Sequence, residues 1–525
     1  MYDYIIIGAG SAGCVLANRL TENPNIRVLL LEAGQRDTAL EIQVPAAFSK
    51  LFKTDLDWNY ATAPQSHLNG REVYWPRGKM LGGSSSMNAM IYIRGNPQDY
   101  DAWQALGNDG WNYDAVLPYF KRAEHNTRGA DAYHGVGGGI HVEDLSDPRP
   151  PSLAFIQAAM QCGIPHNPDF NGAHQEGVGL YQVTMKHAAR HSAAAGYLKP
   201  ILARPNLIIQ TGAHVTRLFS EHGLMNVVEY QLGGIRVQAE ATREILLCGG
   251  AINTPQVLML SGIGDPDQLA AHDIEVIHPL RGVGQNLQDH LAAGLIYHGS
   301  TTYSLYQADA PHHVARYLLA KVGPLTSNVA EGGAYVRTRA ELATPDIQFH
   351  FAPNYFVSNG FANPEGHGLS LGAVLVTPHS RGEIRLASAN PFDAPIIQPN
   401  YLSDPRDLDA LLAGVKLGRR IMAAAPMRPF IRAEYLPGEM IYHDDGLIEH
   451  IRNTSETLYH PIGTCKMGSA SDPLAVVDAE LRLHGVKGVR VVDASIMPVV
   501  PNGNTNAPVL MIAEKAAAMI KAGWD

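Results

Sequence analysis

The first thirty-two residues restrict the fold more than any other part of the chain. Residues Tyr4 to Ile7 are apolar and rich in β-branched side chains, which is typical of a buried parallel strand. A G-x-G-x-x-G turn from Gly8 to Gly13 follows, then a helical stretch to about Leu20 and a second strand, Val28 to Leu31, that ends at Glu32. This order predicts a Rossmann-like βαβ unit.

Each glycine of this turn has a physical role in binding a dinucleotide. Gly8 permits the tight turn, Gly10 lets the backbone approach a pyrophosphate, and Gly13 lets the helix pack closely on the strand. The helix N-terminus presents free N–H groups and a partial positive charge to the phosphates. Glu32 is placed to accept hydrogen bonds from an adenosine ribose. These residues predict a bound dinucleotide and leave both FAD and NAD open.

Length and composition predict a large globular protein. The 525 residues exceed one ordinary hydrophobic core, so two domains are expected. Hydrophobic residues make up 46% of the chain and charged residues 17%, which excludes a disordered chain. The formal net charge is -10, and no long Lys/Arg cluster is present, so nucleic acid is not expected as a partner.

The cysteines and the N-terminus favour a cytoplasmic location. The four cysteines are scattered without a CxxC pair, which disfavours a disulfide framework or a zinc site and favours a reducing compartment. The first residues run directly into a strand, with no signal peptide evident, and no apolar stretch reaches the ~18–20 residues of a spanning helix. Peripheral contact with the inner face of a membrane stays open.

Two further glycine-rich segments are unusual. The first, Gly78 to Asn88, places one glycine pair before three serines, a composition that opposes a regular helix and lets the backbone pass close to a ligand. The second, Gly250 to Gly264, follows an apolar strand from Ile245 to Cys248. With a G-x-N-L-x-D-H segment from Gly284 to His290, these runs resemble the glucose-methanol-choline (GMC) oxidoreductases over nearly the whole chain, most closely the bacterial choline-dehydrogenase-like and long-chain alcohol dehydrogenases.

The GMC resemblance implies FAD as the cofactor. Some members attach FAD through a histidine just before the asparagine of the first segment; here that position is Met87, so non-covalent FAD is expected. The resemblance implies these cofactor-binding residues: Gly8, Gly10, Ser11, Gly13, Glu32, Ala33, Leu81, Gly82, Gly83, Asn88, Ala89, Met90, Val215, Asp493, Ala494, Asn506 and Ala507.

The resemblance also implies a catalytic pair near the C-terminus. His460 stands where relatives keep their base, and Pro461 restricts it to extended backbone geometry. Asn504 aligns with a second catalytic position that is histidine or asparagine in the family, with the nearby Asn502 and Asn506 as alternatives. An amide cannot be a base, so His460, with an ordinary pKa near ~6.5, is expected to be the sole base. Pro508 fits the first turn of a helix to about Ile520, whose N-terminus would face the flavin.

The expected architecture is α/β (α+β overall). A Rossmann-like FAD-binding domain is predicted from residues 1–145, 190–300 and 455–525, and a substrate-binding domain with a mostly antiparallel sheet flanked by helices from 146–189 and 301–454. Ile347, Phe349 and Phe351 alternate with Gln348 and His350, which predicts a sheet with two different faces. Glu331 is read as a salt-bridged surface acid, with contact to a cationic substrate as the alternative.

The implied reaction is oxidation of a neutral, primary alcohol to the aldehyde. His460 takes the hydroxyl proton, the carbinol carbon gives hydride to flavin N5, and a quinone, a cytochrome or O2 receives the electrons. Three alternatives stay open: an oxidase that makes H2O2, a flavin-bound hydroxynitrile-lyase-like enzyme, and a non-catalytic FAD-binding module.

Overall fold

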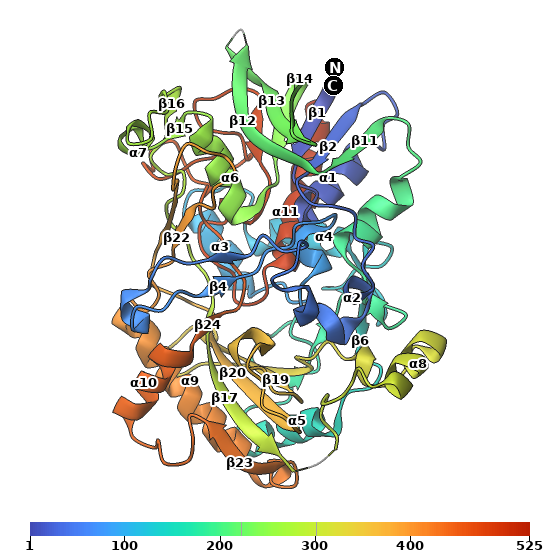
Figure 1. The fold of residues 1–525 in the computed structure, drawn as a ribbon, viewed down its shortest axis with the longest axis vertical. Coiled ribbons are helices and arrows are strands. Elements are labelled where there is room, and N and C mark those ends of the chain that lie inside the picture. Colours follow the sequence, from blue (N-terminus) through green and yellow to red (C-terminus); the bar gives the residue numbers. More distant parts are fainter. Residues whose placement is uncertain (222, 301, 525) are drawn as a thin grey trace.

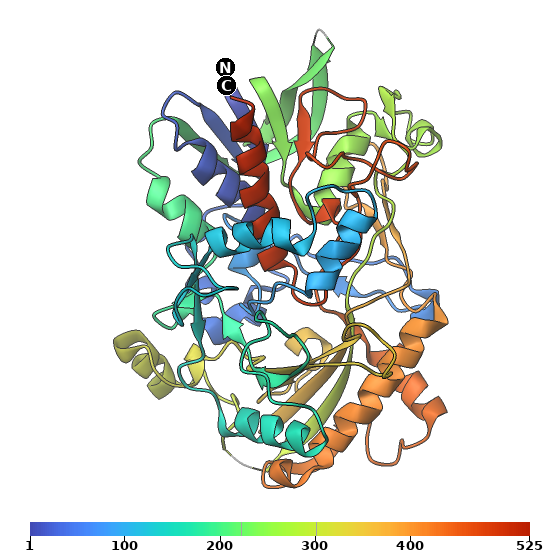
Figure 2. The same ribbon diagram turned by 180° about the vertical axis from the view of Figure 1, so that it is seen from behind.

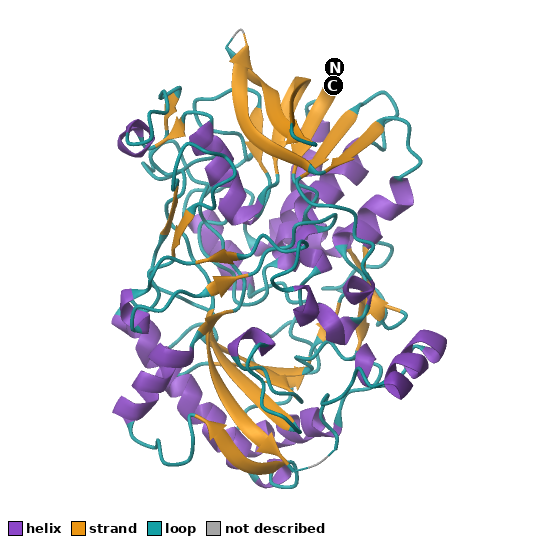
Figure 3. Ribbon diagram, viewed as in Figure 1, coloured by secondary structure: helices purple, strands orange, loops and turns teal. Residues whose placement is uncertain are grey.

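Two seven-stranded sheets organise the computed structural model, which describes residues 1–221, 223–300 and 302–524. Figures 1 and 3 show one sheet at each end of the long axis, with helices and loops between them. The expected α/β architecture, with a Rossmann-like half and a mostly antiparallel half, is confirmed.

The first sheet has the order β11-β2-β1-β14-β13-β12, with β25 paired to β14. Its strands are β1 (Tyr2–Ile7), β2 (Val28–Glu32), β11 (Leu207–Thr211), β12 (Ala213–Glu221), β13 (Leu224–Leu232), β14 (Ile235–Leu247) and β25 (Val489–Val491). Strands β11, β2, β1, the second half of β14, and β25 run parallel, whereas β12, β13 and the first half of β14 form an antiparallel meander. The central parallel strands β1 and β2 are buried over Tyr4 to Ile7 and Val28 to Leu31, and these runs are apolar, as is usual for strands covered on both faces.

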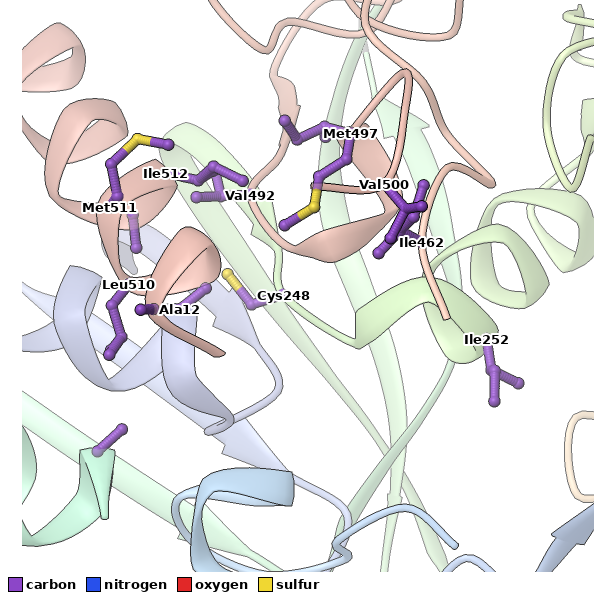
Figure 4. Close-up of a cluster of buried hydrophobic side chains, with 14 of the residues drawn as sticks. Ala12, Cys248, Ile252, Ile462, Val492, Met497, Val500, Leu510, Met511 and Ile512 are labelled. Atoms are coloured by element: carbon purple, nitrogen blue, oxygen red, sulfur yellow. The ribbon is translucent and has the colours of Figure 1, made fainter. Parts of the chain in front are cut away.

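Helices α1 (Ser11–Leu20), α6 (Gly250–Leu260) and α11 (Asn506–Ala522) surround the carboxyl ends of these parallel strands. Helices α1 and α11 pack against each other, and Figure 4 shows Ala12 of α1 beside Leu510 of α11 and Cys248 after β14. The predicted limits of β1, α1, β2 and the C-terminal helix agree with the structure to within two residues. Figure 2 shows α11 running along the body to end near the N-terminus, where Trp524 Nε1 donates to Tyr4 Oη at 2.7 Å.

The second sheet is antiparallel throughout, in the order β23-β17-β20-β19-β18-β7 with β24 paired to β17. Its strands are β7 (Gly177–Leu180), β17 (Leu291–Gly299), β18 (Gly332–Val336), β19 (Ile347–Ala352), β20 (Gly368–Leu375), β23 (Ile431–Leu436) and β24 (Glu456–Thr457). Strand β17 lies within residues 190–300, which were expected in the FAD-binding domain. We therefore propose that the domain boundary falls just before Leu291.

Among the described residues, helices pack on one face of the second sheet. Helices α5 (Pro150–Gln161) and α9 (Pro405–Ala423) pack on it, and α10 (Asp444–Thr454) packs beside α9. Gly414 and Gly418 of α9 approach Ile347 and Phe349, so the odd-numbered residues of β19 face the helices. The even-numbered residues Gln348 and His350 consequently point to the other face, toward the middle of the molecule.

The other helices are α2 (Leu40–Gln43), α3 (Pro97–Ala105), α4 (Tyr113–Ala123), α7 (Pro266–Ala270) and α8 (Pro311–Ala320). Within the described residues, none of the helices combines the length and the apolar character needed to cross a bilayer. All four cysteines are free thiols.

Candidate active site

A cavity of about 480 Å³ lies between the two sheets. One wall comes from the carboxyl ends of the parallel strands, and the opposite wall from the uncovered face of the second sheet. Polar and charged residues from both ends of the chain meet there, as expected for an α/β sheet that binds its ligand at these strand ends.

Most of the predicted cofactor residues line this cavity. They are Gly8, Gly10, Ser11, Glu32, Ala33, Gly83, Asn88, Ala89, Met90, Val215, Asp493, Ala494 and Asn506. The other four predicted cofactor residues do not line the cavity; they are Gly13, Leu81, Gly82 and Ala507. A Cβ on Gly13 would lie 1.9 Å from the carbonyl oxygen of Gly8, so Gly13 allows the helix to pack on the turn, as its spacing predicts.

Two helix N-termini point into the cavity. Helix α1 begins after Gly10 and helix α11 after Thr505, and neither first turn is capped by a side chain. The hydroxyl of Ser11 donates to Asn506 Oδ1 at 2.7 Å, which ties the two first turns together. Free N–H groups and the helix dipoles make this a site for anionic groups.

The two acids of the Rossmann half are already held by backbone donors. Glu32 accepts hydrogen bonds from the N–H groups of Ala9 and Gly34, and burial raises the pKa of its carboxyl to about 7. Asp493 accepts from the N–H of Gly250 and the hydroxyl of Thr254 at the start of α6. Each oxygen of the Glu32 carboxylate accepts one of these bonds and keeps a lone pair for a ligand hydroxyl, which suits Glu32 to a ribose.

The structure brings His460 and Asn504 together. Asn504 Nδ2 lies 3.2 Å from Nε2 of His460, and both residues line the cavity. The backbone N–H of His460 donates to Asp289 Oδ1 at 2.8 Å, and Tyr459 before it has a φ of 70°. This left-handed residue, followed by the extended backbone that Pro461 requires, aims the imidazole at a fixed point.

His460 has a second histidine behind it. The Nδ1 atoms of His460 and His290 lie 2.9 Å apart, and the rings meet edge to face. Burial lowers the pKa of His460 well below 6.5, and the nearby His290 and His350 lower it further. The expectation of an ordinary pKa is therefore wrong: the imidazole is neutral at physiological pH because charging it would require taking a cation out of water.

A chain of hydrogen bonds fixes the proton of this neutral imidazole. Tyr181 donates its only hydroxyl proton to the carbonyl of Phe349 at 2.7 Å, so it accepts from Gln348 Nε2, which lies 3.0 Å away. The same Gln348 amide donates to Asn504 Oδ1 at 3.3 Å. The Asn504 carbonyl is thereby turned from His460, and its NH2 group faces the ring.

The rest of the protonation state follows from this orientation. An NH2 group only donates, so Nε2 of His460 must be the acceptor and carries no proton. The ring proton then sits on Nδ1 and is donated to Nδ1 of His290, whose own proton sits on Nε2. The arrangement presents a neutral lone pair on His460 Nε2 to the cavity, which is what a general base needs.

Three residues of this hydrogen-bond chain were not predicted from the sequence: His290, Gln348 and Tyr181. His290 ends the G-x-N-L-x-D-H segment, so a signal for it was present, whereas Gln348 was read only as part of a polar strand face and Tyr181 carried no signal. Glu331 was placed wrongly: it is fully buried and accepts hydrogen bonds from the hydroxyls of Ser152 and Ser327. It neither forms a surface salt bridge nor lines the cavity.

Comparison with known proteins identifies the family. Models of the GMC oxidoreductase N-terminal and C-terminal regions match residues 2–292 and 378–513. The chain belongs to the GMC oxidoreductase family. It is an FAD-dependent oxidoreductase that acts on CH–OH groups.

Several relatives align over nearly their full length. An alcohol dehydrogenase [acceptor] of Pseudomonas putida is 48% identical, over 99% of this chain and 96% of the relative, and human mitochondrial choline dehydrogenase is 43% identical, over 100% and 91%. Among solved structures, pyridoxine 4-oxidase from Mesorbium loti is 34% identical with a TM-score of 0.91, covering 99% of both chains. The predicted family and cofactor are confirmed.

The chemistry of the cavity wall fits FAD. The uncapped first turns of α1 and α11 suit the pyrophosphate and the electron-rich edge of a reduced flavin, and the Glu32 carboxylate suits the ribose. Gly83 at the cavity wall has a φ of 52°, so glycine is needed where the loop passes Gly10.

Proposed function

We propose that this oxidoreductase converts neutral alcohols to aldehydes or ketones, with His460 as the general base and Asn504 as its partner. The observation that carries the proposal is the neutral Nε2 lone pair of His460 beside the Asn504 NH2 group, 3.2 Å apart at the cavity wall. FAD, when bound, supplies the hydride acceptor.

The residues act on the alcohol oxygen in two ways. The hydroxyl group displaces the Asn504–His460 hydrogen bond and donates its proton to His460 Nε2. The Asn504 NH2 group then donates to the same oxygen and holds the carbinol carbon in a fixed orientation. The negative charge that develops on the oxygen is stabilised by this amide and by the imidazolium that forms.

After Nε2 of His460 is protonated, the imidazolium keeps a hydrogen-bond partner in His290. Once that nitrogen is protonated, the Nδ1 proton strengthens its hydrogen bond to His290, because a charged donor bonds more strongly than a neutral one. His290 itself resists protonation, since burial lowers its pKa to about 3. We infer that His290 orients the imidazolium and accepts part of its charge through this bond.

The acids of the cavity favour a neutral substrate over a cationic one. Three carboxylates line it within the described residues, and each already has partners: Glu32 and Asp493 hold backbone N–H groups, and Glu456 pairs with Arg71 at 2.9 Å. Among the described residues, no acid that lines the cavity remains without a partner to bind a quaternary ammonium group.

Aromatic rings, by contrast, are present in the cavity wall. Phe48, Phe52, Phe356 and Tyr459 line one side of the cavity. Their rings pack mainly on one another, with Phe52 lying 5.9 Å from Phe48 and 5.8 Å from Tyr459 between centroids. This cluster offers an apolar surface that suits aliphatic or aromatic alcohols.

An anaerobic titration of the holoenzyme tests the proposal. A panel of neutral primary alcohols, secondary alcohols and choline is added, and the flavin absorbance is followed before and after air is admitted. Bleaching by neutral alcohols in preference to choline supports the proposal; bleaching by choline alone, or by no alcohol, contradicts it. Rapid recolouring in air identifies an oxidase, and slow recolouring a dehydrogenase that needs a quinone or another acceptor. Cleavage of a hydroxynitrile without bleaching identifies a lyase.

A further inference from the structure

The cavity extends away from His460 along the uncovered face of the second sheet. We call this part the sheet arm; it is lined by Ala292, Gly294, Ile296, Gly372, Val374 and Leu436. The arm starts beside the catalytic pair, because β17 follows directly after His290 and because Gln348, which bonds Asn504, pairs with Val374 across the sheet. Asn453, which is exposed near the end of α10, also lines the cavity.

Two glycines lie opposite each other in the wall of this arm. Gly294 of β17 pairs with Gly372 of β20, and Gly372 pairs with His350 of β19. The three residues form one row across the strands, and within the row only His350 carries a side chain. A furrow therefore crosses β20 and β17 for two interstrand spacings, about 10 Å in all.

These glycines are not required by packing. A Cβ on Gly294 would meet only the end of the Ile296 side chain, at 3.7 Å, and a Cβ on Gly372 only the His350 carbonyl oxygen, at 4.0 Å. Other glycines of the same sheet are crowded, as at Gly333, where a Cβ would lie 1.9 Å from Tyr181 Oη. Glycine in a strand interior weakens the strand and often marks a place where a ligand approaches the backbone. Since no protein atom needs the space beside Gly294 and Gly372, a ligand is the better explanation for these two glycines.

The furrow leads from a polar end to an apolar floor. At the catalytic end, Nε2 of His350 has no hydrogen-bond partner in the described chain. Beyond it the side chains of Ala292, Ile296 and Val374 are aliphatic. The acid beside Ala292 on the neighbouring strand, Glu456, forms an ion pair with Arg71. A molecule with one polar end and an uncharged hydrocarbon tail matches this order.

We propose that the furrow over Gly294 and Gly372 binds the tail of an unbranched aliphatic alcohol whose hydroxyl lies at His460 and Asn504. The proposal rests on the proposed function and names its substrate class. Each methylene that leaves water for the furrow raises kcat/KM by about fourfold until the arm is filled. A side chain on either glycine shortens the tail that fits.

Glycine variants test the furrow against chain length. The kcat/KM of the holoenzyme is measured for 1-butanol and 1-decanol in wild type, Gly372→Val and Gly294→Val. We expect the decanol-to-butanol ratio to be high in wild type and to fall at least tenfold in both valine variants, and by less in Gly372→Ala and Gly294→Ala. Ala315→Val on the exposed side of α8, a matched addition of volume, leaves the ratio unchanged. An unchanged ratio in the valine variants overturns the proposal.

Binding without turnover separates this proposal from the proposed function. The tertiary alcohol 2-methyl-2-undecanol has no hydrogen on its carbinol carbon, so it binds but cannot be oxidised. Weaker binding to Gly372→Ala and Gly372→Val than to wild type, measured by calorimetry, supports the furrow even if no alcohol reduces the flavin. Equal binding to folded wild type and variants rejects the furrow even if alcohols are oxidised. Flavin content and thermal unfolding identify folded variants, and the alanine variants keep the test valid if valine prevents folding.

Discussion

The Nδ1 atoms of His290 and His460 lie 2.9 Å apart, with their ring planes at 90°. Two neutral imidazoles can share this contact only if one donates and the other accepts. Because the Asn504 amide places a donor at Nε2 of His460, His460 is the donor and His290 the acceptor. Asn504 on one side of the His460 ring and His290 on the other thus keep the lone pair on Nε2 of His460.

Replacing His290 tests this assignment. His290→Leu removes the acceptor and leaves the buried Nδ1–H of His460 without a partner, so we expect kcat to fall about tenfold or more, the worth of one hydrogen bond. His290→Asn places a carbonyl oxygen near the position of Nδ1 and recovers most of the rate. Single-turnover flavin reduction measures both variants; equal rates for Leu and Asn would show that the acceptor is unimportant.

Tyr181 orients the catalytic amide from a distance. In Tyr181→Phe, Gln348 loses the acceptor that fixes its amide, so Gln348 and Asn504 flip and His460 loses its preferred tautomer. We expect kcat to fall about tenfold, with a changed pH profile. Tyr335→Phe is the matched control, because the buried Tyr335 hydroxyl has no hydrogen-bond partner among the described residues. A rate loss of equal size in both variants would point to a packing effect alone.

The pH dependence of kcat/KM reports the environment of His460. The reaction needs an unprotonated Nε2, and burial lowers the pKa of His460 well below 6.5. Activity should therefore persist as the pH falls through 6.5 and decline only when the pH passes the lowered pKa. An ordinary histidine would lose half of the activity near ~6.5, and an inflexion at that pH would refute the assigned environment.

Acid should destabilise the fold through the same group of histidines. Burial lowers the pKa of His290 and His350 to about 3. Below pH 6.5 the unfolded chain binds protons that the folded chain does not, so the free energy of unfolding falls by up to ~1.4 kcal/mol per pH unit for each histidine. His350→Phe should flatten the fall in urea midpoint between pH 6.5 and 4.5. The exposed His67→Ala should leave that slope as it is.

The FAD attachment has a simple chemical test. Met87 lines the cavity where some relatives carry the linking histidine, and a thioether does not form that bond. We expect acid precipitation to release all flavin into the supernatant. A yellow pellet after washing would mean that another side chain holds the cofactor covalently.

The local parts of this fold could be predicted from the sequence. Strand β1, the turn at Gly8 and helix α1 follow from apolar runs and glycine spacing, which act over a few residues. The alternation in β19 also showed two faces, but not that the polar face of Gln348 and His350 would meet the catalytic residues. That relationship depends on pairing between strands far apart in the chain.

The residues of the candidate site that lie in family motifs could be predicted from the sequence. His460 and Asn504 came from family positions, and they meet as expected. The hydrogen bonds that fix the tautomer of His460 were not predictable, because only the antiparallel packing of the second sheet brings Tyr181 and Gln348 together. The lowered pKa of His460 was missed for the same reason: burial is a property of the assembled cavity and not of the loop around Pro461.

Rapid anaerobic mixing of a neutral primary alcohol with His460→Ala holoenzyme measures the contribution of His460 to flavin reduction. We expect FAD content to stay at the wild-type level while the rate of flavin reduction falls by about 10²–10⁴-fold, the usual contribution of a general base. Flavin reduction at the wild-type rate in the variant would contradict the assignment of His460 as the base.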